Sequence, residues 1–159
     1  MTGRWALVTG ASDGIGVEFC KLLAARGYNL VLVARREQQL HAVAAQLSAA
    51  HDVATRVVPC DLAKAGAAQK LYRTTHELGI PVDFLVNNAG LLHNGYFDEI
   101  DLRTQEDLLA VNVVALTALT ALTHLFVESF ARRPAFCPST NSAMLARTSA
   151  HNEGSSAVS

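Results

Sequence analysis

Residues 9–16 read Thr9-Gly10-Ala11-Ser12-Asp13-Gly14-Ile15-Gly16, and the three glycines of this stretch decide the fold. The stretch follows a short apolar run at 5–8 and opens a segment of helical period that continues to Arg26. A glycine-rich turn between a buried strand and a helix is where a backbone receives a phosphate. A side chain at any of the three glycines would block the phosphate, while unpaired N–H groups of the first helical turn face it. The stretch predicts a dinucleotide site; a tight turn without a ligand is the alternative.

Apolar runs of strand length alternate with longer segments of helical period along the first 130 residues. The expected strands are 5–8, 29–34, 54–60 and 82–87, and the expected helices are 15–26, 36–50, 64–78 and 104–130, the last with Asp101 as its N-cap. Continuous apolar strands alternating with helices indicate parallel β-α-β units. We therefore expect an α/β fold with a parallel sheet.

The amino-acid composition of the sequence changes after Arg133. Residues 134–159 are rich in Ser, Ala, Asn and Thr and contain no apolar run of strand length. We expect one dinucleotide-binding domain over 1–133 and an irregular or disordered tail over 134–159.

Composition limits the classes of function. Half of the 159 residues are hydrophobic, 17% are charged and the formal net charge is −1. This balance predicts a globular domain without a nucleic-acid partner and without a polybasic membrane contact. The three cysteines, Cys20, Cys60 and Cys137, show no zinc-site spacing and favour a reducing, cytoplasmic location. His124 and Glu128 share a helical face, but we expect a surface pair there and no metal.

One apolar segment is long enough to raise the question of a membrane. Residues 108–127 are nearly uncharged, yet they contain an asparagine, three threonines and a histidine. A helix buried on most sides inside an α/β protein has the same composition. We therefore expect a core helix and no membrane contact.

Four motifs in order along the chain resemble those of the short-chain dehydrogenase/reductase family. The turn at 9–16 has the spacing of the family's glycine fingerprint, and Asp61-Leu62 resembles its contact to the adenine ring. The stretch 87–90 (Asn-Asn-Ala-Gly) resembles the turn that lies against its cofactor, and Asn112 resembles the asparagine of its catalytic tetrad. The likeness covers about residues 3–130, and it implies a Rossmann-type, doubly wound parallel sheet of strand order 3-2-1-4, truncated here after the fourth helix, so that the domain over 1–133 is incomplete. Because the likeness stops abruptly, we expect a frameshifted or aberrantly spliced end from Pro134 onward; a natural end is the alternative. The resemblance also implies a catalytic role for Asn112 and cofactor contacts from Gly10, Ser12, Asp13, Gly14, Ile15, Gly16, Arg35, Asp61, Leu62, Asn88, Ala89 and Gly90.

The end of the second expected strand bears on the choice of cofactor. An acidic residue there would bind the ribose 2′-hydroxyl of NAD and repel a 2′-phosphate. This chain has Ala34-Arg35-Arg36 instead, and a guanidinium pairs well with a phosphate. We expect NADP in preference to NAD, with Arg35 as the phosphate contact and Arg36 as a solvated residue at the helix start. Asp13 weakens this expectation, since family members that prefer NADP often place a basic residue nearby.

The resemblance also implies a tyrosine, a lysine four residues later and a preceding serine, which together move the substrate proton. The tyrosines of this chain are Tyr28, Tyr72 and Tyr96, and the residues four places on are Leu32, His76 and Ile100. The last lysine is Lys70, so no residue after Asn112 fills either role. The family activity would be NADP-dependent hydride transfer to or from a small carbonyl or alcohol, and we expect it to be crippled here. A silent dinucleotide-binding fragment is the alternative, and a homo-oligomer is an open question.

Overall fold

The computed structural model describes residues 3–131, with side chains described as far as residue 123. The expected tail, 134–159, lies outside the described residues.

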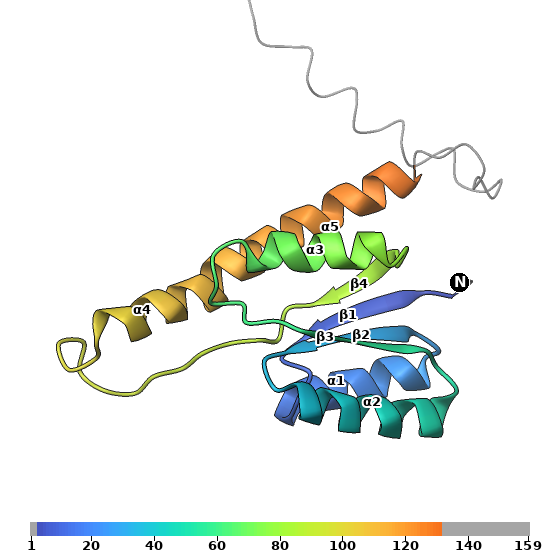
Figure 1. Cartoon of the computed structure of the whole chain (residues 1–159), viewed down its shortest axis with the longest axis horizontal. Helices are drawn as coiled ribbons and strands as arrows, with labels where there is room; N and C mark the ends of the chain where they lie inside the picture. The colour runs from blue at the N-terminus through green and yellow to red at the C-terminus, as the bar shows by residue number, and fades with distance from the viewer. Residues whose placement is uncertain (1–2, 132–159) are drawn as a thin grey trace, which may run out of the picture.

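The described residues form one parallel sheet of four strands, β1 (Trp5–Thr9), β2 (Asn29–Ala34), β3 (Thr55–Pro59) and β4 (Val82–Val86). The strand order is β3-β2-β1-β4, and each neighbouring pair is parallel. The expected order 3-2-1-4 is therefore confirmed. Figure 1 shows α1 (Gly14–Ala25) and α2 (Glu37–His51) below the sheet and α3 (Ala67–Glu77) above it, which gives the doubly wound, three-layer arrangement.

Side-chain alternation along the central strands creates a core on each face of the sheet. Trp5, Leu7, Val31 and Val33 pack with apolar side chains of α3 and α5 (Leu116–Ala131). Their neighbours along β1 and β2 point the other way and pack with α1 and α2. Because β1 and β2 are buried on both faces, their sequences read as continuous apolar runs.

The start of α3 differs from the expected residue 64. The helix begins at Ala67, after Gly66, whose φ of +73° lies in the left-handed region. Before it, the Asp61 carboxylate accepts from the Ala63 N–H at 3.2 Å, and the Lys64 N–H donates to the Asp61 carbonyl at 3.1 Å. Since the aspartate supplies local acceptors, the chain turns here instead of starting a helix, and Asp61 and Leu62 are held at the end of β3.

The single helix expected over 104–130 is wrong in detail. The structure has α4 (Leu102–Leu109), a π-helical segment η1 (Ala110–Ala115) and then α5. Asp101 caps α4 as expected, because its carboxylate accepts from the Thr104 N–H at 3.0 Å. The η1 segment carries three β-branched valines, which lose side-chain freedom in a regular α-helix. It also contains Asn112, and one-turn π segments occur frequently at functional sites.

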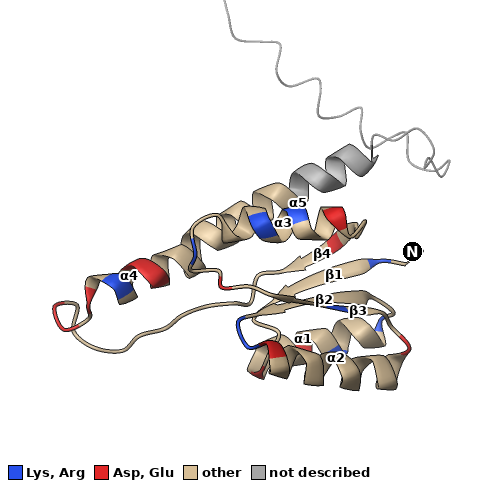
Figure 2. Ribbon diagram, in the orientation of Figure 1, with Lys and Arg blue, Asp and Glu red and all other residues tan. Residues whose placement is uncertain are grey.

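The expectation that this helix is buried on most sides is also wrong. We call residues 102–123 the helical arm. Its inner face, with Val111, Ala115 and Leu119, joins the core, but Leu109 is 56% exposed and Val114 is 64% exposed. Figure 2 shows charges near the start of α4, followed by an uncharged stretch of η1 and α5. Within the described residues, Leu102–Thr123 is the one helical stretch that is long and apolar enough to cross a membrane, judged by length and composition alone, and little of it is buried.

Candidate dinucleotide-binding site

A cavity of about 330 Å³ lies at the carboxyl ends of the parallel strands. Its walls come from the turns after all four strands and from the start of α1. In open α/β sheets ligands bind at this edge, where the strand order reverses on either side of the first strand. The lining residues are Gly10, Ser12, Asp13, Gly14, Ile15, Val33, Ala34, Arg35, Arg36, Cys60, Asp61, Leu62, Asn88, Ala89, Gly90, Leu91 and Val111.

The glycines of the first turn are required for two different reasons. Gly10 and Gly14 have φ of +68° and +55°, a backbone region that side chains disfavour. Gly16 has an ordinary φ, but a Cβ there would collide with the Gly10 carbonyl and approach the Asn88 side chain to 2.7 Å. Protein atoms, as well as an incoming phosphate, therefore exclude a side chain at Gly16. Beyond Gly14 no protein atom lies within 4 Å of such a Cβ, which leaves open space at the helix start.

We call residues 9–16 together with 88–90 the cradle, and the Thr9 hydroxyl holds its two parts together. Thr9 is 1% exposed, and its Oγ1 donates to the Val86 carbonyl at 3.2 Å. The same oxygen accepts from the N–H groups of Asn88 and Ala89, each at 3.0 Å. The Asn88 amide in turn donates to the carbonyls of Thr9 and Gly10 at 3.1 and 3.3 Å. These bonds fix the turn after β4 against the glycine turn.

The N-terminus of α1 retains free donors toward the cavity. Asp13 is the N-cap residue, but its carboxylate accepts no hydrogen bond from the first turn of the helix, and that turn contains no acidic residue. The unpaired N–H groups and the positive end of the helix dipole are suited to a pyrophosphate. The cradle therefore fits the diphosphate of a dinucleotide.

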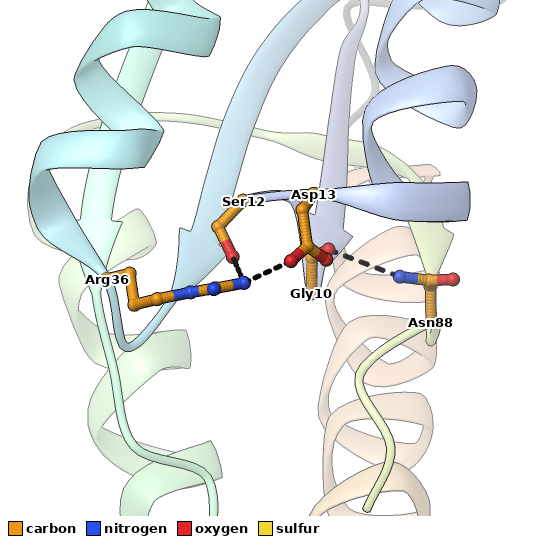
Figure 3. Close-up of polar contacts among 5 residues, drawn as sticks. All are labelled: Gly10, Ser12, Asp13, Arg36 and Asn88. Carbon is orange, nitrogen blue, oxygen red and sulfur yellow. Dashed lines mark hydrogen bonds and ion pairs between the residues drawn. The ribbon is translucent and has the colours of Figure 1, made fainter.

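The Asp13 carboxylate turns instead to Arg36. The Arg36 Nη2 donates to Asp13 Oδ2 in an ion pair and to Ser12 Oγ at 3.2 Å. Figure 3 shows this bridge between the glycine turn and the start of α2, next to the bond from Asn88 to Gly10. Arg35 also lines the cavity and is exposed; within residues 3–131 the structure gives it no hydrogen bond or ion pair. Of these two neighbouring arginines, Arg36 is thus ion-paired, whereas Arg35 has no ion pair within residues 3–131.

Three further residues line the cavity near the end of β3. Asp61 and Leu62 lie on its wall as expected, and Cys60 joins them. Burial is the main factor that raises the pKa of the Cys60 thiol, and the neighbouring Asp61 charge raises it further. The thiol is therefore neutral near pH 7, and it contributes shape to the wall and no charge.

Asn112 lies behind the cavity, at the loop that follows the cradle. Its Oδ1 accepts from the Leu91 N–H at 2.9 Å, and its Nδ2 donates to the Leu91 carbonyl at 2.8 Å. Both polar groups of the amide are engaged with one backbone residue, so Asn112 anchors the start of the 91–101 loop. This arrangement gives Asn112 a positioning role; the catalytic role stays a prediction.

The structure brings most of the predicted site residues together. The cavity wall contains Gly10, Ser12, Asp13, Gly14, Ile15, Arg35, Asp61, Leu62, Asn88, Ala89 and Gly90. Gly16 and Asn112 support the wall from behind without lining it. Sequence reasoning missed Thr9 and the bridging role of Arg36. A polar residue at the end of a buried strand was a usable signal for Thr9, whereas the Arg36 contact had none.

The pattern of the short chain dehydrogenase family matches residues 4–133. The chain belongs to this family.

Among curated relatives, the very-long-chain 3-oxoacyl-CoA reductase of Scheffersomyces stipitis is 37% identical over 122 residues, which cover 74% of this chain and 35% of that protein. The 7beta-hydroxysteroid dehydrogenase of Collinsella aerofaciens is 35% identical over 112 residues, covering 70% of this chain and 42% of that protein. Among solved structures, a short-chain dehydrogenase from Sphingobium yanoikuyae in complex with NADPH has a TM-score of 0.73 and 35% identity, over 79% of this chain and 49% of that one. The chain thus spans well under half the length of these curated relatives.

Proposed function

We propose that residues 3–131 form the part of an NADP-dependent oxidoreductase that binds the adenosine and pyrophosphate of the cofactor. The observation that carries this proposal is the cradle at the strand ends, with two arginines after β2 where an NAD-binding site would have an acidic residue. Membership of the family supports the oxidoreductase class, and the similar protein from Sphingobium yanoikuyae was solved with NADPH.

The cofactor would supply or accept a hydride, and the residues of this chain would hold it. The N–H groups at the start of α1 would bind the pyrophosphate, and Asp61 and Leu62 would lie against the adenine. Arg35 would pair with the 2′-phosphate, because its guanidinium reaches the cavity without a competing partner among the described residues. Ala89 and Gly90 would form the opposite wall.

The substrate side of the proposal is a small carbonyl or alcohol. The similar proteins named for activity are a 3-oxoacyl-CoA reductase and a hydroxysteroid dehydrogenase, whose names share a carbonyl–alcohol conversion. A tyrosine activated by a lysine four residues later is the proton donor that the family pattern implies, and these 159 residues contain no such pair. We therefore propose, as the second candidate function, that these 159 residues bind NADP without turning over a substrate.

The first experiment is a fluorescence titration of the folded 159-residue protein with NADPH and with NADH. Binding of NADPH that is tighter than binding of NADH supports the proposal. Failure to bind either at millimolar concentration contradicts it. A dehydrogenase assay with a panel of alcohols and ketones then separates the two candidate functions, since turnover would contradict the silent one.

The exposed side of the helical arm supports a further part of the proposal, the pairing of two copies. Leu109, Val113, Val114 and Leu116 are exposed apolar side chains on the described part of one helical stretch. Exposed apolar side chains that gather into a patch mark interaction sites in soluble proteins. Sedimentation velocity at several protein concentrations tests the pairing, and a monomer at all of them would contradict it.

A further inference from the structure

The bridge between Asp13 and Arg36 joins two walls of the cavity. Asp13 precedes α1 in the glycine turn, Arg36 precedes α2, and both line the cavity. The side chains are 68% and 53% exposed, so solvent and ions reach the pair. One nitrogen of the guanidinium, Nη2, makes both contacts, to the carboxylate and to Ser12 Oγ.

The bridge changes what Arg36 offers to a ligand. A guanidinium binds a phosphate best through two parallel N–H···O bonds, with its full charge available. In this structure the Asp13 carboxylate is already bound to Arg36 and offsets that charge locally. A 2′-phosphate that binds Arg36 through the same N–H groups must first displace the Asp13 carboxylate from them.

The carboxylate has no other role among the hydrogen bonds of the described chain. It does not cap α1, and its only contact there is with Arg36. Arg35, one residue earlier, has no such partner within residues 3–131. Arg35 is therefore available to a ligand in the cavity, whereas the Asp13 carboxylate already occupies Arg36.

We propose that Asp13 is a specificity-determining residue. Its carboxylate competes with the 2′-phosphate of NADP for Arg36 and so reduces the factor by which the protein binds NADP more tightly than NAD. This inference rests on the proposed function. It predicts that the bridge opens when the phosphorylated cofactor binds and stays closed with the cofactor that lacks the phosphate.

The test is the variant Asp13→Asn in the 159-residue chain, which keeps the size of the side chain and removes its charge. The dissociation constants of NADPH and NADH are measured by fluorescence titration. We expect the ratio of the NADH constant to the NADPH constant to rise about three- to fivefold, the range of a partly exposed ion pair. Glu18→Gln is the matched control, because it also removes one negative charge from a similarly exposed ion pair, that with Lys21, but outside the cavity wall. It should change the ratio by less than about 1.5-fold.

A double-mutant cycle shows whether the effect acts through Arg36. In an Arg36→Met background, Asp13→Asn should leave the ratio within about 1.5-fold. If the ratio rises equally in both backgrounds, Asp13 repels the phosphate directly and the inference is overturned. If Asp13→Asn lowers the ratio, the carboxylate orients Arg36 for the phosphate, which also overturns it. Circular dichroism checks folding, and Asp13→Ser replaces the asparagine variant if that protein does not fold.

The proposed function and this inference fail in different ways. A wild-type chain that binds neither NADPH nor NADH overturns the proposed function, and the inference falls with it. A wild-type chain that prefers NADPH, with an unchanged ratio in Asp13→Asn, overturns the inference alone.

Discussion

The cradle and the helical arm are held in the molecule by different means. The cradle is fixed by glycine geometry and by hydrogen bonds of 3.0 to 3.2 Å that converge on the buried hydroxyl of Thr9. The arm is fixed by one apolar face, while its other face leaves Leu109 and Val114 in solvent. The comparison teaches that local stereochemistry specifies the candidate site, whereas the arm depends on what packs against it. We expect substitutions to be costly in the cradle and mild on the outer face of the arm.

The largest effect is expected for Thr9→Val, which keeps the shape of the side chain. The substitution removes the acceptor of the Ala89 N–H and one of the two acceptors of the Asn88 N–H, which also donates to the Val86 carbonyl at 3.1 Å, in a partly buried place. We expect a loss of about 3 kcal/mol in the free energy of unfolding, measured by urea denaturation. The control is Thr75→Val, another buried threonine, whose hydroxyl only donates to the Tyr72 carbonyl at 2.8 Å. Equal losses of stability in the two variants would contradict the role of Thr9 in holding the two parts of the cradle together.

The next effect is expected for Gly16→Ala. The new methyl group meets the Gly10 carbonyl and the Asn88 amide, so the two parts of the cradle must separate. We expect a loss of about 2 kcal/mol in the free energy of unfolding and weaker binding of NADPH. Gly27→Ala is the control, since that position has a φ of +76° and no neighbour within 4 Å of an added Cβ. It should cost about 1 kcal/mol and leave NADPH binding intact; weaker binding there would contradict the steric explanation.

Asn112→Ala tests the link between the cradle and the arm. The variant removes both hydrogen bonds to the Leu91 backbone, and we expect a loss of about 1.5 kcal/mol in the free energy of unfolding. Hydrogen exchange at the Leu91 amide should become faster than in the wild type. Asn87→Ala is the control, because it removes one exposed bond to Thr120 and should leave exchange at Leu91 unchanged. Unchanged exchange in Asn112→Ala would exclude the anchoring role.

A smaller effect concerns pH at the start of the arm. The hydroxyl and the N–H of Thr104 both donate to the Asp101 carboxylate, which lowers the pKa of Asp101. The unfolded pKa of an aspartate is near 3.9, and the folded pKa of Asp101 lies below it. The stability that the charged Asp101 contributes is therefore complete above the unfolded pKa and is lost as pH falls through the folded pKa. NMR of the Thr104 amide should therefore report a midpoint below about 3.9. In Asp101→Ser, which caps without titrating, that transition should vanish; its persistence would assign it to another group.

The smallest effect on stability is expected for Val114→Lys. The side chain is 64% exposed, so the free energy of unfolding should change by less than about 0.5 kcal/mol. Binding of a hydrophobic dye should decrease, because an apolar patch becomes charged. The contrasting variant, Leu119→Ala on the buried face, should cost about 3 kcal/mol. A large loss of stability in Val114→Lys would mean that the outer face is covered.

The parts of the fold that follow from local rules were predictable from the sequence. The glycine turn and the Asp101 cap depend on backbone conformation, and the parallel β-α-β units depend on the alternation of apolar runs, all of which the residues display directly. The strand order followed from the resemblance to the family. The Arg36 bridge was not predictable, because it joins the starts of two helices and depends on where the first two crossovers place them. The π-helical segment around Asn112 and the exposure of Val114 were also not predicted, since apolar periodicity does not reveal which face of a long helix has a neighbour.

The hydrogen bonds of the Thr9 hydroxyl have a consequence for the rate at which a ligand binds. Because the turn after β4 is locked to the glycine turn within the protein itself, the width of the cavity is set before any ligand arrives. Such preorganisation removes the need for slow rearrangement during association. If NADPH binds as proposed, we expect diffusion and the opening of the Asp13–Arg36 bridge to be the steps that limit its on-rate.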